Sequence, residues 1–381
     1  MKSKLSQYIS EKFFSVCLVL FLLFTTVYTA FRTENAVWQL WGLHIYGAVA
    51  VFYLLLFFLS WFFHRQRAFP PIRRFWIRLE GSLFCFLFYF VLILLICDAA
   101  AVAVFFFHKN SVVFAISWCF AIGISLGLVA YGMVHARRLK TVRYDVRLGE
   151  GKKDYRMILL SDLHIGAFVG LGYIKKVVEK VNSLSPDMVV ITGDIFNNGY
   201  AEECGSPDAV GAVLGTLQTK DGVYAVLGNH DPAYSDEKMR CFFQKANIRL
   251  LYNELLPFPF FTLVGRNDLL HYKQYSEVRT PLSELLRKKP EQKPLIVLDH
   301  NPDGIDEAIE NGAKLILCGH THRGQMFPLT FLTRLAYEKN HFYGHAALGE
   351  AQTVVSAGTG YFQLPVRLGT NSEIVEIDLK L

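Results

Sequence analysis

The chain has 381 residues, of which 52% are hydrophobic and only 19% are charged, whereas a soluble domain usually carries about 25% charged residues. Its formal net charge of +6 divides unevenly: residues 1–150 carry 15 Lys/Arg and 6 Asp/Glu, a net +9, and the remaining residues carry 24 and 27, a net −3. This distribution excludes an ordinary soluble globule and argues against a basic nucleic-acid-binding surface, so we expect a membrane partner and no nucleic acid.

Four apolar stretches in the first half are long enough to cross a bilayer, which requires about 20 residues per helix. They are residues 13–31, 42–63, 82–107 and 112–134. The first exceeds the roughly 7–15 apolar residues of a secretory signal peptide, although cleavage of this stretch, or a re-entrant path for one of the four, stays open. We therefore expect an all-α region of four transmembrane helices over residues 1–140.

Lysine and arginine are concentrated in alternate connections between these stretches, and such a bias sets orientation. The basic connections hold Lys2, Lys4, Lys12, Arg65, Arg67, Arg73, Arg74, Arg78, Arg137, Arg138, Lys140, Arg143 and Arg147. The intervening loops contain only Arg32 and Lys109. The pattern predicts that both termini, and everything after Val134, are cytoplasmic.

Two further features of the sequence bear on the membrane region and its compartment. Asp98 is the one charged residue within the predicted spans, and we expect a hydrogen-bonded or protonated carboxylate near a span end, although intramembrane carboxylates are often functional. The seven cysteines have no paired spacing, which favours a reducing compartment and disfavours a thiolate zinc site.

After residue 150 the sequence pattern changes to short apolar runs separated by residues typical of turns and helices. Residues 157–160, 188–192, 223–227, 295–298, 315–317, 353–356 and 374–379 are predicted buried strands, and residues 173–183 and 236–245 are predicted helices. Alternating strands and helices indicate an α/β domain over residues 150–381, which is large enough for one core.

Residue types that bind metals cluster where these predicted strands end. They are Asp162, His164, Asp194, Asn229, His300, His320 and His322. Side chains at i and i+2 of an extended backbone point to the same side, so Asp162 with His164, and His320 with His322, are each expected to present two ligands to one place. Loops at the carboxyl ends of strands are also the usual location of active sites in α/β folds.

The chemistry of this set indicates two metal ions. Carboxylate, imidazole and amide ligands without thiolates suit manganese, iron or zinc. Seven such groups exceed what one ion needs, and they fit two ions about 3.5–4 Å apart that share a bridging carboxylate, an arrangement used to attack phosphate esters.

The motif order Asp-x-His, Gly-Asp, Gly-Asn-His-Asp, His and Gly-His-x-His resembles the calcineurin-like metallophosphoesterase superfamily from Tyr155 onward. Residues 161–164, 319–325 and 364–367 resemble its bacterial membrane-associated branch, and UDP-2,3-diacylglucosamine diphosphatase belongs to the wider superfamily. The resemblance implies a four-layer αββα sandwich. It also implies that one ion is held by Asp162, His164, Asp194 and His322, and the other by Asp194, Asn229, His300 and His320.

The resemblance further implies roles for residues beside the ligands. His230 matches the catalytic histidine that protonates the leaving oxygen or stabilises its charge. Asp231 is expected to orient the His230 imidazole, and Arg323 is expected either to bind a phosphate oxygen or to form a surface ion pair. Asp299, Asp268 and the turn at residues 358–360 are expected to be structural.

These features together predict a membrane-anchored, two-metal phosphoesterase in a bacterial inner membrane, which hydrolyses a phosphate ester or pyrophosphate by attack of a metal-bound hydroxide. A lipid-linked substrate at the inner leaflet is preferred, because the catalytic region follows the last span closely and a basic segment at residues 137–147 would attract anionic headgroups. Apolar stretches at residues 255–261 and 326–332 would suit an acyl chain if exposed, and core packing otherwise. Two alternatives stay open: a tethered enzyme for a soluble nucleotide or phosphoprotein, and a non-catalytic membrane sensor or scaffold. The oligomeric state is open.

Overall fold

The computed structural model describes residues 2–45, 47–64, 70–105, 112–149, 153–197, 203–287, 293–338 and 340–381. The chain divides into two compact units. The first, here called the helical unit, comprises Met1–Gln66 and Leu79–Tyr131, and the second, the catalytic unit, comprises Arg67–Arg78 and Gly132–Leu381. Arg65, Arg67 and Lys109, which contributed to the predicted orientation, lie outside the described residues.

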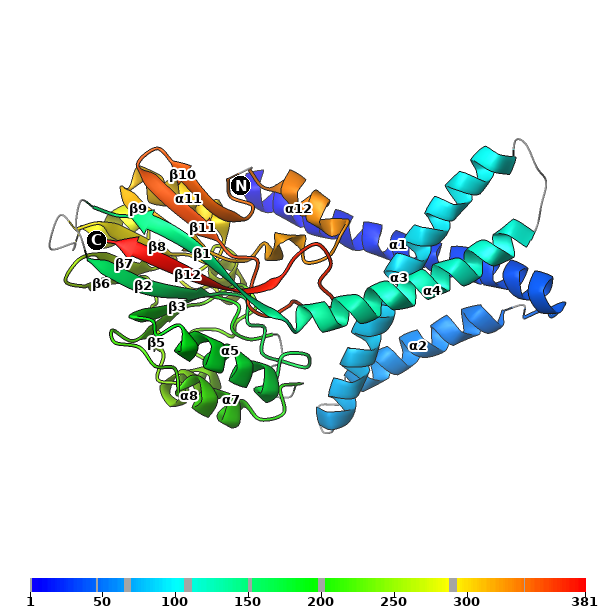
Figure 1. Cartoon of the computed structure of the whole chain (residues 1–381), viewed down its shortest axis with the longest axis horizontal. Coiled ribbons are helices and arrows are strands. Elements are labelled where there is room, and N and C mark those ends of the chain that lie inside the picture. The colour runs from blue at the N-terminus through cyan, green and yellow to red at the C-terminus, as the bar shows by residue number, and fades with distance from the viewer. Residues whose placement is uncertain are drawn as a thin grey trace. The chain divides into compact units, whose positions relative to one another are not determined.

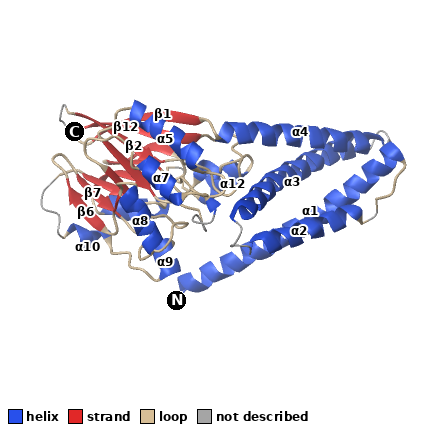
Figure 2. Ribbon diagram, turned by 90° about the horizontal axis from the view of Figure 1, so that it is seen from below, coloured by secondary structure: helices blue, strands red, loops and turns tan. Residues whose placement is uncertain are grey.

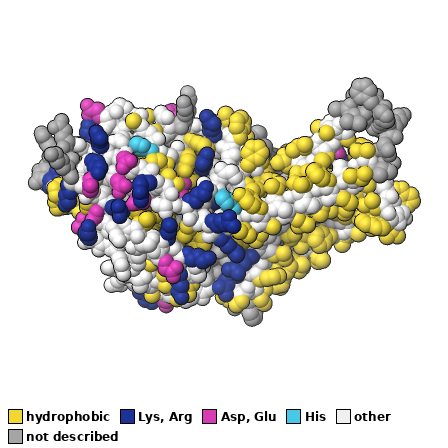
Figure 3. Space-filling model, viewed as in Figure 1, with side chains coloured by type: hydrophobic (Ala, Val, Ile, Leu, Met, Phe, Trp, Pro, Cys, Tyr) yellow, Lys and Arg dark blue, Asp and Glu magenta, His cyan; other side chains and the backbone are white. Residues whose placement is uncertain are grey.

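The first half of the chain consists of four long helices. They are α1 (Lys2–Trp41), α2 (Ala48–His64), α3 (Pro70–Phe105) and α4 (Val112–Ala136). Among the described residues, two stretches are long and apolar enough to cross a membrane, Pro70–Ala101 and Val113–Ala136. Apolar side chains predominate over charged ones on the described part of this half, whereas Lys, Arg, Asp and Glu side chains are interspersed on the catalytic unit (Figure 3). The third and fourth predicted spans thus meet the requirement by length and composition.

Two charged groups of the helical unit, Arg32 and Asp98, neutralise each other. Arg32, expected in a loop, lies instead within α1, where its buried side chain forms an ion pair with Asp98 of α3. Tyr28 donates a hydrogen bond of 2.6 Å to the same carboxylate, and Arg32 also donates to the carbonyl of Phe114 and the hydroxyl of Ser117. Two opposite charges in contact are far less costly in an apolar environment than either one alone. The expectation of a hydrogen-bonded Asp98 is confirmed, and the loop position of Arg32 is corrected.

The catalytic unit contains two six-stranded sheets in its described residues. The first has the order β1-β12-β2-β3-β4-β5, and the second β10-β11-β9-β8-β7-β6. The strands are β1 (Leu139–Arg147), β2 (Asp154–Leu160), β3 (Met188–Thr192), β4 (Val223–Val226), β5 (Arg249–Leu250), β6 (Glu254–Pro257), β7 (Thr262–Gly265), β8 (Leu295–Leu298), β9 (Ala313–Cys318), β10 (Gly344–Leu348), β11 (Ala351–Val355) and β12 (Ser372–Lys380).

Three apolar cores give this unit four layers (Figures 1 and 2). One core packs α5 (Leu171–Ser183), α7 (Pro207–Leu214) and α8 (Glu237–Lys245) against the first sheet, and it buries the predicted stripe of α5 at Val177, Val178 and Val181. A second core joins the facing sides of the two sheets. A third packs α10 (Leu282–Leu286) and α11 (Ile305–Glu310) against the second sheet. The expected αββα sandwich is therefore observed in the catalytic unit.

Parallel pairing aligns the carboxyl ends of the strands that precede the predicted ligands. In the first sheet β2, β3 and β4 are parallel, with Leu160 opposite Ile191 and Thr192 opposite Val226. In the second sheet β8 and β9 are parallel, with Leu298 opposite Leu317. The loops that follow these five strands consequently emerge at corresponding ends of their sheets.

The boundary between the two halves differs from the expected one. The basic segment at residues 137–147 is not a free linker, because most of it forms β1, which pairs in parallel with β12. Arg143 is an ion-pair partner of Glu376, at 2.7 Å, and of Asp378, so it is engaged by the protein rather than held free for lipid headgroups. The start of α3 also belongs to the catalytic unit, where Arg78 donates to the Ala167 carbonyl at 2.6 Å.

Candidate metal centre

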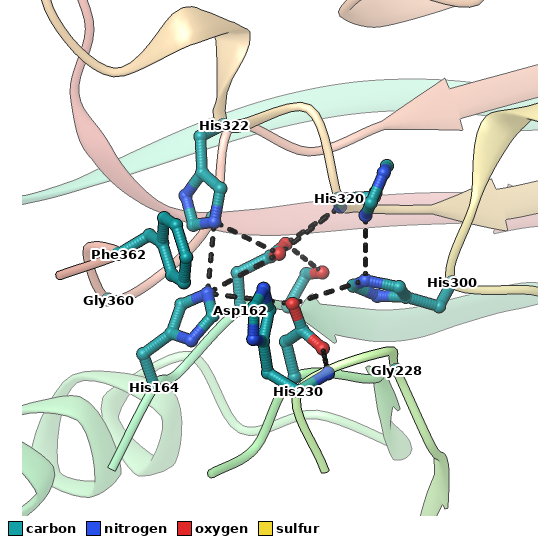
Figure 4. A network of polar contacts seen from close by, with 12 residues as sticks. Asp162, His164, Gly228, His230, His300, His320, His322, Gly360 and Phe362 are labelled. Carbon is teal, nitrogen blue, oxygen red and sulfur yellow. Dashed lines mark hydrogen bonds and ion pairs between the residues drawn. The ribbon is translucent and has the colours of Figure 1, made fainter. Parts of the chain in front are cut away.

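The predicted ligands meet where the two sheets' strand ends converge (Figure 4). They are placed as predicted by the loops after five strands: Asp162 and His164 after β2, Asp194 after β3, Asn229 after β4, His300 after β8, and His320 and His322 after β9. Six of them, all except Asn229, fall into two groups of potential ligands, and within each group the ligand atoms lie within 4.8 Å of one another.

The first group consists of Asp162, His164 and His322, all of which are buried. Nε2 of His164 lies 3.0 Å from Nε2 of His322, and Nε2 of His322 lies 3.3 Å from Oδ1 of Asp162. The Nδ1 atoms of both histidines are buried and have no hydrogen-bond partner in the described part of the chain. Two imidazole nitrogens therefore point at one another beside a carboxylate.

The second group consists of Asp194, His300 and His320. Nε2 of His300 lies 3.2 Å from Nδ1 of His320 and 3.2 Å from the side-chain oxygen of Asn229. Nδ1 of His300 lies 2.8 Å from the carbonyl oxygen of Thr192. A carbonyl only accepts hydrogen bonds, so Nδ1 carries a proton and Nε2 faces the group. Burial would lower the pKa of His300, but the Asp194 carboxylate raises it well above its usual value.

Asp194 connects the two groups. Its Oδ2 atom lies 3.6 Å from Nε2 of His164 in the first group and 3.3 Å from Nε2 of His300 in the second. Its Oδ1 atom accepts a hydrogen bond of 2.9 Å from the backbone N–H of His230. The carboxylate is thus fixed in a position from which it can bridge two ions.

The ligand-bearing backbone is left-handed rather than extended. The φ angles are 52° at Asp162, 47° at His164, 50° at Asp194, 70° at His320 and 49° at His322. Residues other than glycine rarely adopt such angles, and they cluster at functional sites. This corrects the assumption of extended pairs: Asp162 and His164 do share a group, but His320 and His322 contribute to different ones.

Glycines next to the ligands are required by close backbone approach. A Cβ atom on Gly228 would lie 2.3 Å from Oδ1 of Asp194, and one on Gly319 would lie 2.4 Å from Oδ2 of Asp162. Any side chain there would displace a carboxylate of the site. The glycines of the Gly-Asn-His-Asp and Gly-His-x-His motifs therefore serve the geometry of the ligands.

Burial sets the protonation of most of these groups. It lowers the pKa of His164 to about 3 and that of His320 to about 4, and it raises the pKa of Asp162 to about 7. Burial alone would also raise the pKa of Asp194, but His300 and its hydrogen bond, with His164, hold it well below its usual range. His164 and His320 are therefore neutral near pH 7, the form in which imidazole binds metals.

These residues fit two divalent cations. Imidazole nitrogens that face each other at 3.0 and 3.2 Å, beside carboxylate oxygens, form a convergent set of potential ligands for a cation. The two groups contain carboxylates and imidazoles and no cysteine, which is the donor chemistry of manganese, iron or zinc. Each group offers three ligands, Asp194 is shared, and Asn229 adjoins the second group.

His230 lies beside the two groups without belonging to either. Its ring centroid is 5.6 Å from that of His164 and 4.5 Å from that of Phe362, and burial lowers its pKa. The Phe362 ring also packs 5.0 Å from His164 and 6.0 Å from His322. Phe362 was not predicted from the sequence, where its only signal is its closeness to the motif at residues 364–367.

The structure corrects the expected role of Asp231. Its carboxylate is fully buried and accepts backbone hydrogen bonds of 2.8 Å from Phe196 and of 2.8 Å from Gly228. Oδ1 thus binds the loop after β3, and Oδ2 binds the loop after β4. Asp231 fastens these two loops to each other instead of orienting the imidazole of His230.

Two arginines near the site have different surroundings. The guanidinium carbon of Arg323 lies 4.4 Å from the centroid of the Tyr343 ring, so its ordinary contact is a cation–π interaction rather than an ion pair. Arg367 is fully buried and donates hydrogen bonds of 2.7 Å to the carbonyls of Ala357 and Gly360. Sequence reasoning noted Arg367 only as part of a motif, and the structure makes it the support of the turn at residues 358–360.

That turn is structural, as expected. The N–H of Thr359 donates to the Ser161 carbonyl at 2.7 Å, and the N–H of Gly360 donates to the Asp162 carbonyl at 3.0 Å. These amides are therefore occupied by the protein and brace the strand end that carries Asp162.

Two acidic residues and two histidines outside the ligand groups are also buried in the catalytic unit. Asp299 forms an ion pair of 2.6 Å with Arg279, and Asp268 accepts backbone hydrogen bonds from Leu270 and His271, so both are structural as expected. His271 and His341 are buried as well.

Comparison with known proteins agrees with this geometry. The sequence profile of the family described as calcineurin-like phosphoesterase matches residues 155–324. Two uncharacterized metallophosphoesterases of Helicobacter pylori are similar to the chain. One, from strain 26695, is 32% identical over 64% of this chain and 64% of its own length, and the other, from strain J99, is 31% identical over 68% and 70%.

Other organisms contain relatives as well. A zebrafish protein named transmembrane protein with metallophosphoesterase domain is 32% identical over 68% of this chain and 62% of its own length. An Escherichia coli protein named phosphodiesterase YaeI is 29% identical over 59% of this chain and 82% of its own length. The chain thus spans less than two thirds of the zebrafish relative and of one Helicobacter relative.

Proposed function

The chain belongs to the calcineurin-like metallophosphoesterase family, and from this premise we propose that it is a membrane-anchored phosphoesterase that hydrolyses a lipid-linked phosphate ester or pyrophosphate at the cytoplasmic leaflet. Metal-dependent phosphoester hydrolysis is the activity of the family. The ligand assignment, the anchoring and the substrate class are the parts that we add.

The position of Asp194 carries the proposal for the metal centre. Its Oδ2 atom is within 3.6 Å of one ligand group and 3.3 Å of the other. We assign Asp162, His164, Asp194 and His322 to one ion, and Asp194, Asn229, His300 and His320 to the second. Two divalent ions in these positions would supply Lewis acidity and lower the pKa of an attacking water.

The remaining residues of the site would position the substrate and move a proton. His230 is half-buried, stands outside both ligand groups and packs on Phe362, so its imidazole is placed to protonate a leaving oxygen. Phe362 restricts water at this edge of the site. Arg323 is close in sequence to the ligand His322, and a phosphate oxygen would compete with the Tyr343 ring for its guanidinium.

The anchoring proposal combines composition with orientation. We propose four membrane spans over residues 1–140 and a cytoplasmic catalytic domain over residues 150–381, with both termini cytoplasmic in a bacterial inner membrane. The apolar stretches of α3 and α4, the basic connections and the zebrafish relative's name support this arrangement. A lipid-linked substrate is preferred because α4 continues without interruption to within a few residues of β1.

The substrate proposal is tested by hydrolysis with the full chain in detergent micelles. Wild type and Asp194→Asn are incubated separately with a bacterial lipid extract and with a nucleotide mixture, and phosphorylated products are followed by mass spectrometry. We expect a phospholipid or lipid-linked pyrophosphate to be consumed by the wild type alone. Consumption of nucleotides alone would favour the tethered enzyme for soluble substrates, and no consumption of either would favour a non-catalytic sensor or scaffold.

A further inference from the structure

Helix α12 (Leu329–Ala336) exposes large apolar side chains on the catalytic unit. Phe331 is 60% exposed, Leu332 57% and Leu335 68%, and none of the eight residues of this fully described helix is buried. By contrast, α5 and α8 bury their apolar faces against the first sheet. A cluster of exposed apolar residues on one short helix marks a surface that meets another apolar phase or partner.

The start of α12 lies beside the end of a helix that is apolar enough to span the membrane. The N–H of Phe327, two residues before α12, donates to the Leu368 carbonyl at 2.9 Å. The adjacent residue Arg367 donates through its N–H to the carbonyl of Gly132, in the last turns of α4, at 3.2 Å. All four residues belong to the catalytic unit, so this proximity is a property of that unit alone.

The sequence at the end of α4 indicates how deep this end would lie in a membrane. Its apolar stretch runs to Ala136, and Arg137 and Arg138 follow directly. An apolar helix that gives way to two arginines places its end at the boundary between acyl chains and headgroups. Since one short segment, residues 366–370, joins the end of α4 to the start of α12, α12 begins close to this boundary.

The composition of α12 fits the same boundary. Its sequence, Leu-Thr-Phe-Leu-Thr-Arg-Leu-Ala, has an exposed arginine, Arg334, and no acidic residue. Helices that lie in the plane of the interface combine aromatic and leucine side chains on one side with basic residues on the other, and anionic headgroups attract their positive charge. The apolar side chains and the charge of α12 therefore both suit a lipid surface.

We propose that α12 lies in the headgroup region of the membrane as a second contact of the catalytic unit with lipid, made through Phe331, Leu332 and Leu335. This inference rests on the proposed anchoring by α4. It deepens the proposed function, because α12 begins only seven residues after the ligand His322. The side chain of Gln325, in this connection, donates to the carbonyl of Phe362, whose ring packs on the site histidines. The contact would hold the site beside the phosphates of the leaflet.

The test measures where α12 lies in the full chain, reconstituted in vesicles of phosphatidylethanolamine and phosphatidylglycerol. A genetically encoded fluorescent amino acid replaces Phe331 in one sample and Phe260 in a control sample. Phe260 is also an exposed phenylalanine of the catalytic unit, but it lies in the turn between β6 and β7, at the start of β7. The site lies at the opposite ends of the strands, since β7 is parallel to β8.

We expect lipid-borne nitroxide to quench the probe at position 331 and aqueous iodide to quench the probe at position 260. Iodide quenching at 331 as strong as at 260 would overturn the proposal. Protection of position 331 from both quenchers would also overturn it, because it would indicate a protein partner. Release of the whole chain from the vesicles by alkaline carbonate would instead remove the anchoring on which the inference rests.

A second variant separates the role of this surface from the fold and the chemistry. Phe331→Ser combined with Leu332→Ser and Leu335→Ser changes exposed side chains outside both ligand groups. We expect this variant to hydrolyse a water-soluble diester at the wild-type rate in detergent, while proteolysis in vesicles cuts at α12 faster than in the wild type. Equal proteolysis at α12 in the two proteins would contradict the proposal, and loss of hydrolysis in both would point to failure of the phosphoesterase assignment itself.

Discussion

At the scale of single residues, the site depends on buried carboxylates that are fixed by hydrogen bonds from backbone N–H groups. Asp194 lies between two ligand clusters and is fixed by the backbone N–H of His230. Asp231 fastens the loops after β3 and β4 through the N–H groups of Phe196 and Gly228. We therefore propose separable tasks for these two neighbouring residues, proton transfer for His230 and loop structure for Asp231.

His230→Ala tests the proton-transfer task. We expect the rate of hydrolysis of a methyl phosphodiester to fall by about 100-fold or more, the usual contribution of a general acid. With 4-nitrophenyl leaving groups the loss should be much smaller, because nitrophenolate leaves without a proton. Steady-state kinetics with both esters, and metal content by mass spectrometry, provide the measurement. Equal losses with both esters would contradict the assignment.

Asp231→Ala tests the structural task. The substitution leaves two buried N–H groups without an acceptor, and each costs about 1–3 kcal/mol. We expect a lower midpoint of thermal unfolding, with residual activity that keeps the shape of the wild-type pH–rate profile. The control Asp208→Ala removes an exposed carboxylate that pairs with Lys245 and should change little. Unchanged unfolding together with a shifted pH profile would show that Asp231 acts on His230 after all.

The convergence of the proposed ligands was predictable from the sequence, whereas their supports were not. Metal-binding residue types that directly follow apolar strands are expected at one edge of a sheet, whatever the conformation of their loops. The left-handed backbone at Asp162 and His322 has no such signature, because any residue can be forced into it by surrounding contacts. Phe362 and Arg367 reach the site through a loop that returns from far along the chain, and local patterns carry no information on that return.

At the scale of elements, α11 is tied to its neighbours by one carboxylate. Glu307 of α11 accepts a hydrogen bond of 2.9 Å from the N–H of Leu282, at the start of α10, and contacts the buried guanidinium of Arg266, which follows β7. Burial would raise the pKa of Glu307, but the Leu282 N–H and Arg266 lower it below its usual value. The ionised carboxylate thus stabilises the outer layer of the second sheet.

Glu307→Gln should therefore destabilise the protein in a pH-dependent manner. A carboxyl group whose pKa is lower in the folded state stabilises the protein at a pH above the pKa of the unfolded state. This stabilisation is lost as the pH falls through the pKa of the folded state. We expect a cost of about 1 kcal/mol near pH 7, because partial exposure screens the pair, and a smaller cost near pH 4. Thermal unfolding at both pH values measures it, with Glu350→Gln, at an exposed ion pair with Lys314, as the control. A cost that grows on acidification would contradict the account.

The elements that the sequence predicted are those with continuous apolar cores. Strand β3, for example, has five buried residues in a row and was predicted at its observed bounds. Strand β1 was not predicted because its arginines resemble the basic flank of a membrane span. Only the pairing of β1 with β12 shows that Arg143 faces an acidic partner, Glu376. The apolar stretch at residues 326–332, which overlaps the start of α12, fits either core or surface, since composition does not say whether another layer covers it.

At the scale of the whole molecule, the chain combines two units of different surface composition. The helical unit contains an ion pair between buried Arg32 and partly exposed Asp98, and the catalytic unit has mixed surface charge around three apolar cores. The end of α4 and the start of α3 both belong to the catalytic unit. A truncation at residue 140 would cut into β1, so experiments on this protein are better designed with the full chain.

The proposed orientation is testable with a native thiol. Cys241 is exposed on α8 of the catalytic unit. We expect a membrane-impermeant maleimide to leave it unlabelled in intact cells and to label it after the inner membrane is permeabilised, with Cys241→Ser as the control for specificity. Labelling at this position in intact cells with a permeable outer membrane would reverse the orientation.

Metal-dependent hydrolysis is the most direct test of the central claim. The full chain in detergent is stripped with a chelator, and wild type and Asp194→Asn are then titrated with manganese while metal content and hydrolysis of bis(4-nitrophenyl) phosphate are measured. The account predicts that activity is lost on chelation, returns in the wild type as two manganese ions bind per chain, and does not return in Asp194→Asn, which binds fewer ions. Wild-type hydrolysis that survives chelation, or that is no greater than that of Asp194→Asn, would contradict it.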